Sequence, residues 1–76
     1  MTQYKNTWHN PASRDSKEFF ETDAKPIHYK GYDIFRRLPE CYDIVKDGIC
    51  IHQRAGLNGA KETIDYIILE EAMECL

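Results

Sequence analysis

Apolar and polar residues alternate along residues 41–53, and an Asp-Gly pair interrupts the alternation at Asp47 and Gly48. Both central positions of a type I′ turn need positive φ, which this pair tolerates. The pattern therefore predicts a β-hairpin whose turn is closed by Lys46 and Ile49. The expected cross-strand pairs are Val45 with Cys50, Ile44 with Ile51, Asp43 with His52, and Tyr42 with Gln53.

A third strand is expected just before this hairpin, over residues 27–38, with Gly31 as a bulge or bend. The segment Leu38-Pro39-Glu40-Cys41 predicts a tight turn, because proline has the φ that the second position of a type I turn requires. The resulting pairs are Arg37 with Tyr42, Arg36 with Asp43, Phe35 with Ile44, and Ile34 with Val45. Together the three strands make an antiparallel meander.

These registers divide the meander into two faces. The first face is apolar and carries Phe35, Tyr42, Ile44, Ile49 and Ile51. The second face is half charged and carries Tyr32, Ile34, Arg36, Asp43, Val45, Cys50, His52 and Arg54. Burying the charged row of Arg36, Asp43 and His52 would be costly, so we expect the first face to form the core and the second to face outward.

The C-terminal segment has the periodicity of an amphipathic helix beginning at Ala60, with Asn58 as its N-cap. Its apolar side is formed by Ala60, Ile64, Ile67, Ile68 and Ala72, and its charged residues fall mostly on the opposite side. A further apolar edge consists of Leu69, Met73, Cys75 and Leu76. We expect that three short strands cannot bury this edge completely.

The first 26 residues lack a sustained period, yet they contain Tyr4, Trp8, Phe19 and Phe20. We interpret residues 1–26 as an aromatic arm, with a short helix near residues 15–22. The predicted fold class is therefore α+β: a three-stranded antiparallel β-meander with one C-terminal amphipathic helix packed on one face, over residues 27–76, preceded by the N-terminal arm.

Composition narrows the class of protein. A chain of 76 residues suits one small domain. Its net charge of −3, from 10 basic and 13 acidic residues, argues against nucleic acid or an anionic membrane as the partner. The longest apolar run is Ile67-Ile68-Leu69, and the N-terminus lacks the apolar core of a secretory signal, so we expect a cytoplasmic protein. An odd number of cysteines, 3, favours reduced thiols.

Candidate chemistry is sparse. Cys41, Cys50 and His52 are residue types that bind zinc, but the expected register separates the two thiols by roughly 13 Å along the ladder, which is too far for one metal ion or a disulfide. Asp43 and His52 could form an acid-base pair, but a small sheet with one helix offers no deep cleft. The sequence therefore predicts a protein without catalytic residues, metal site or cofactor.

The segments Tyr29-Lys30-Gly31-Tyr32, Lys46-Asp47-Gly48 and Asn58-Gly59-Ala60-Lys61, followed by Ile64-Asp65, give the chain a resemblance to small strand-strand-helix proteins of temperate phages and prophages. The resemblance covers residues 27–69. It implies a short, cytosolic, non-enzymatic protein. Some phage proteins of this kind act by binding and blocking a bacterial host protein. The layout also resembles the arm-site DNA-binding domain of tyrosine integrases. Neither resemblance assigns a functional residue.

The main hypothesis is a protein-binding module of the phage accessory type, an inhibitor or adaptor of a bacterial host protein. Its expected contact residues are Trp8, Phe19, Phe20, Tyr32, Ile34, Arg36, His52 and Arg54. The alternatives are a sheet-mediated DNA-binding module and an acidic mimic of nucleic acid built on Glu62, Asp65, Glu70, Glu71 and Glu74. We also expect the domain to self-associate as a homodimer that covers its remaining apolar surface, and the alternative is a monomer that keeps this surface free for its target.

Overall fold

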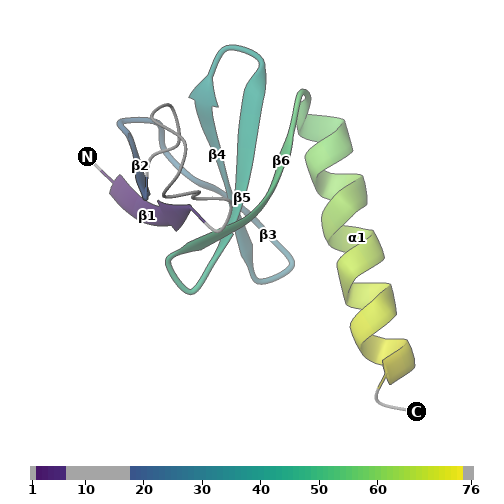
Figure 1. Cartoon of the computed structure of the whole chain (residues 1–76). Helices are drawn as coiled ribbons and strands as arrows, with labels where there is room; N and C mark the ends of the chain where they lie inside the picture. The colour runs from purple at the N-terminus through teal and green to yellow at the C-terminus, as the bar shows by residue number, and fades with distance from the viewer. Residues whose placement is uncertain (1, 7–17, 75–76) are drawn as a thin grey trace.

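The computed structural model describes residues 2–6 and 18–74, which form one mixed β-sheet and one α-helix (Figure 1). In chain order the elements are β1 (Thr2–Asn6), β2 (Phe19–Thr22), β3 (Ile27–Tyr29), β4 (Tyr32–Leu38), β5 (Cys41–Lys46), β6 (Ile49–Arg54) and α1 (Leu57–Glu74). The six strands are ordered β2-β1-β6-β5-β4-β3. The α+β class is as expected, but the three-stranded meander is wrong.

The additional strands at the N-terminus come from the region expected to be an arm. β1 pairs antiparallel with β2 and parallel with the start of β6, where the Lys5 N–H donates to the Gly48 carbonyl at 2.9 Å. Residues 19–22 are a strand, so the helix expected over residues 15–22 is wrong there; residues 15–17 lie outside the described part of the chain. The aromatic and β-branched residues of β2 suit an extended backbone.

Two tight turns have the left-handed backbone that a two-residue hairpin needs. Asp47 and Gly48 have φ of 54° and 77°, which confirms the predicted turn between β5 and β6. Lys30 and Gly31 have φ of 49° and 87° and join β3 to β4, with Tyr29 paired to Tyr32. The single strand expected over residues 27–38 is therefore a hairpin, and Gly31 belongs to its turn.

Register irregularities in two strand pairs overturn the expected faces. Between β5 and β6 the pairs Lys46 with Ile49 and Val45 with Cys50 form as predicted, but beyond an irregularity Ile44 pairs with His52. An irregularity also lies between Arg36 and Leu38, at the turn end of the β4–β5 ladder. Side chains in a strand alternate between faces, so a shift of one residue moves every later side chain to the other face.

The observed register between β4 and β5 differs from the expected one by one residue. Ile34 pairs with Ile44, Phe35 with Asp43, and Arg36 with Tyr42. Ile34 and Ile44 consequently share a face, whereas the predicted register placed them on opposite faces.

One face of the sheet packs against α1 and forms the larger core cluster. Its buried residues are Tyr32, Ile34, Ile44, Ala60 and Ile64. Half-buried hydrophobic residues surround them: Tyr29, Tyr42, Ile51, Leu57, Ile67 and Ile68. Tyr32 and Ile34, which were expected on an exposed face, are therefore core residues under the helix.

The opposite face is covered by the chain's own N-terminal strands. Tyr4 on β1 stacks on Phe35 with ring centroids 5.2 Å apart, and Phe20 on β2 contacts Tyr4 edge-on at 6.2 Å. The Arg37 guanidinium carbon on β4 lies 3.9 Å from the centroid of the Phe20 ring, although three strands separate β2 from β4 in the sheet order. The sheet must therefore coil strongly, and β1 and β2 lie on the side away from α1 (Figure 1). The predicted exposed sheet face is wrong.

Candidate interaction surface on the C-terminal helix

The helix α1 is longer than the sheet that supports it. Its 18 residues span about 27 Å, whereas β5 and β6, at 6 residues each, span about 20 Å. Figure 1 shows the last turns of α1 running past the ends of the strands. Only Ala60 and Ile64 of this helix are fully buried. The structure thus confirms the expected uncovered apolar edge at Leu69 and Met73, whereas Cys75 and Leu76 lie outside the described residues.

Three large apolar side chains lie on the side of α1 that points away from the sheet. Tyr66, Leu69 and Met73 are 62%, 58% and 64% exposed, and their spacing of three and four residues puts them on one side of the helix. Leu69 and Met73 belong to the apolar edge expected from the sequence, whereas Tyr66 does not, although it has the same spacing. We call these three residues the outer stripe of α1.

Acidic side chains border the outer stripe. Every charged residue from Glu62 to Glu74 is acidic, and the last turn has no basic residue. Asp65 is paired, since Lys30 Nζ lies 2.6 Å from its carboxylate. This hydrogen bond holds the pKa of Asp65 below its usual value. Within residues 2–6 and 18–74, Glu62, Glu70 and Glu74 form no salt bridge.

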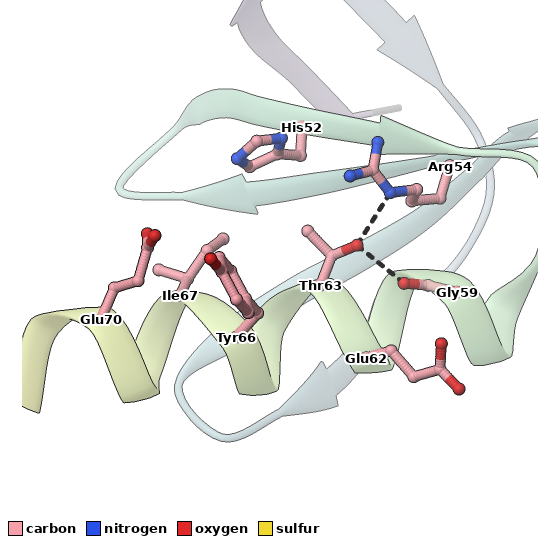
Figure 2. A pocket seen from close by; sticks show the side chains of 8 residues that line it. All are labelled: His52, Arg54, Gly59, Glu62, Thr63, Tyr66, Ile67 and Glu70. Carbon is pink, nitrogen blue, oxygen red and sulfur yellow. Dashed lines mark hydrogen bonds between the residues drawn. The ribbon is translucent and has the colours of Figure 1, made fainter.

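A groove of about 400 Å³ lies beside the outer stripe, between α1 and β6 (Figure 2). Arg54 Nε donates to Thr63 Oγ1 at 2.8 Å, and the Thr63 hydroxyl donates to the Gly59 carbonyl at 2.8 Å, which closes one end. The other lining residues are His52, Glu62, Tyr66, Ile67 and Glu70. Tyr66 therefore belongs to both the groove and the outer stripe, and Glu70 lies where the two meet.

A buried polar cluster on the opposite face centres on Asp43, whose side chain is fully buried. Its carboxylate accepts hydrogen bonds from Arg37 Nε at 2.6 Å, from Gln53 Nε2 at 3.1 Å, and from the hydroxyl of Tyr4. The Cys41 thiol donates to the same carboxylate at 3.4 Å. A buried charge is tolerated only when it is paired and hydrogen-bonded in this way, so the cluster's clearest role is to hold β1, β4, β5 and β6 together.

The thiols near this cluster are weak nucleophiles. Burial, followed by the charge of Asp43, raises the pKa of Cys41 above its ordinary value, and the same causes raise that of Cys50 to about 12. Both thiols therefore stay protonated near neutral pH, whereas the thiolate is the reactive form. Cys41 and Cys50 are not joined by a disulfide, as expected. Among the described residues, no group of three His, Cys, Asp or Glu side chains is arranged to hold a metal ion.

The expected contact residues are dispersed over the structure. Trp8 lies outside the described residues. Phe19 is exposed on β2, and Phe20 is half-buried against Tyr4. Arg36 is exposed and donates to the Pro39 carbonyl.

Two of the expected contact residues do come together, since His52 and Arg54 both line the groove beside α1. Their role in partner binding stays a prediction.

No family model, curated protein or solved structure matches the chain. In the described part of the chain, α1 lacks the run of apolar residues that a membrane-crossing helix would need. An inference about function therefore rests on the surface of the chain itself.

Proposed function

We propose that this chain is a small non-enzymatic protein-binding module whose contact surface is the outer stripe of α1. The observation that carries the proposal is the alignment of Tyr66, Leu69 and Met73 on one side of a helix whose other side is already packed on the sheet. Single exposed apolar residues are normal on protein surfaces, but an aligned set of large ones is typical of interfaces. Tyrosine and methionine are also residue types enriched there.

The cover on the sheet also favours this surface over the sheet. Both faces of the sheet are covered by the chain itself, one by α1 and the other by β1 and β2, which leaves neither face available to enter a DNA groove. This argues against the DNA-binding alternative. The resemblance to phage-encoded proteins adds to the proposal a bacterial host protein, in the cytoplasm, as the target.

Site-specific photo-crosslinking tests this proposal in cells that produce the protein. Leu69 is replaced by benzoylphenylalanine, and Leu38, a leucine of similar exposure at the β4–β5 turn, is replaced in the same way as a matched control. We expect a discrete protein adduct from position 69 that is absent from position 38. The adduct should weaken strongly when Met73→Asn is added, because burying an amide without a hydrogen-bond partner would oppose binding.

The captured protein is then purified and mixed with the pure chain. Binding that depends on Met73 supports the proposal. Equal adducts from positions 69 and 38, or none from position 69, would overturn it.

A further inference from the structure

We infer that the partner presents a basic amphipathic helix, whose apolar side packs on the outer stripe and whose Lys or Arg residues face the acidic border of α1. This inference rests on the proposed function and specifies its partner. Helix-on-helix recognition of this kind uses anchors at three- and four-residue spacing. Tyr66, Leu69 and Met73 have that spacing and extend over about two helical turns.

The negative charge of α1 favours a partner with positive charge. Glu70, Glu71 and Glu74 lie in the C-terminal part of the helix, where the backbone dipole already places partial negative charge. Acidic residues at this end are unfavourable in the isolated chain, and no basic residue of the last turn compensates for them. A cationic partner would relieve this repulsion, whereas an acidic partner would increase it.

The same charges argue against a second copy of the chain as the occupant. Two outer stripes packed together would bring Glu62, Glu70 and Glu74 of one copy close to those of the other. Lys61 is the only basic residue of α1, and its Nζ lies 5.6 Å from the centroid of the Tyr29 ring, on the side of the helix near β3. Self-association through this surface would therefore place like charges opposite each other without compensation.

The groove beside β6 gives one cation of the partner a defined position. Tyr66 and Glu70 border this groove and the outer stripe together (Figure 2). A Lys or Arg that extends past Leu69 can place its charge over the Tyr66 ring and next to the Glu70 carboxylate. The opposite end of the groove holds the guanidinium of Arg54 as well as Glu62 (Figure 2), so the Glu70 end suits a cation better.

The probe is a synthetic helical peptide of about 18 residues, which matches the length of α1, with leucines on one side and lysines on its flanks. Its binding to the intact chain is measured by fluorescence anisotropy in low salt, and its position is mapped by amide chemical shifts. A peptide with the same leucines but glutamates in place of the lysines is the control for charge. We expect micromolar affinity for the basic peptide and shift changes centred on residues 66–74.

Matched variants separate the apolar contribution to peptide binding from the electrostatic contribution. Leu69→Ala should weaken binding about tenfold, because a central apolar anchor is lost, whereas Leu38→Ala should change it by less than about twofold. The double change Glu70→Gln and Glu74→Gln should weaken binding about threefold and flatten its salt dependence. Glu40→Gln, at the β4–β5 turn, is the control for the loss of one exposed carboxylate.

Equal affinity for the lysine and glutamate peptides would overturn the inference, as would shift changes away from α1 or a stripe-dependent dimer of the chain alone in light scattering. A partner crosslinked at position 69 that is acidic or strand-shaped would also overturn it. Those results would not contradict the proposal that the chain is a protein-binding module. That proposal fails separately, if position 69 captures no specific protein.

Discussion

Replacing Arg37 with methionine is expected to destabilise the fold by about 3 kcal/mol, because it leaves the buried carboxylate of Asp43 without its cation. Arg37 Nε lies 2.6 Å from this carboxylate, and the side chains are 18% and 0% exposed. Burial by itself would lower the pKa of Arg37, but the hydrogen bond to Asp43 and the charge of its carboxylate together raise that pKa above its ordinary value. Chains of this length are stable by roughly 4 to 11 kcal/mol, so the loss is a large fraction of the total.

Urea denaturation followed by circular dichroism measures this loss. The matched control is Arg36→Met. The Arg36 side chain is exposed at the neighbouring position and donates to the Pro39 carbonyl, so we expect a cost below about 1 kcal/mol. Adding Asp43→Asn to Arg37→Met should recover about 1 kcal/mol, because no charge then remains buried. If Arg37→Met costs no more than Arg36→Met, Asp43 is not held by this pair.

Other substitutions test the fold at separate points. Ile34→Ala should cost about 3 kcal/mol by urea denaturation, since Ile34 is fully buried under α1, whereas Leu38→Ala should cost less than about 1 kcal/mol; equal costs would refute the assignment of the core face. Gly48→Ala should lower stability by about 1 kcal/mol through its φ of 77°, and an unchanged midpoint would contradict the type I′ turn. The pKa of Cys50 is raised from 9.0 to about 12, so the unfolded thiol loses its proton first; stability should be full below pH 9 and fall by about 1 kcal/mol per pH unit between pH 9 and 12, in reducing buffer. Cys50→Ala should remove that part of the alkaline loss, and an equal loss in the variant would exclude the thiol as its source.

The hairpin turn and the helix could be predicted because each depends on nearby residues. Asp47 and Gly48 meet the backbone requirement of the turn by themselves, and the spacing of Ala60, Ile64 and Ile67 indicates one helical side. The same periodicity showed that Leu69 and Met73 exceed what a small sheet can cover. The helix begins at Leu57 rather than Ala60, which places Asn58 inside its first turn instead of at the N-cap.

The two faces of the sheet could not be predicted from alternation alone. The irregularities between Ile44 and Val45 and between Arg36 and Leu38 shift the register by one residue, and the alternation of apolar residues does not reveal such a shift. The burial of Asp43 has a separate cause, because β1 covers the face of the sheet on which Asp43 lies. Hydrogen bonds from Arg37, Gln53 and Tyr4 stabilise the buried carboxylate. Tyr4 lies 39 positions away in the sequence, so the residues near Asp43 do not indicate this contact.

The N-terminal strands were missed for a related reason. β1 and β2 are short and lie at one edge of the sheet, and their buried residues include the polar Asn6 and Thr22 as well as Tyr4. Apolar and polar residues therefore do not alternate along β1 and β2 in the way that indicates a half-buried strand. The sequence predicts a bulge or bend at Gly31, whereas Lys30 and Gly31 form a turn in which lysine has a positive φ that it rarely adopts.

Hydrogen exchange of the α1 amides, with and without the protein captured at position 69, tests the central claim most directly. In the chain alone the last turns of α1 should exchange fast, because the residues from Glu70 to Glu74 are exposed and the buried anchors Ala60 and Ile64 lie far from them. Binding on the outer stripe should slow exchange over residues 66–74 and leave residues 38–41 unchanged. Protection confined to β2, β4 or the β4–β5 turn, with α1 unaffected, would contradict the account.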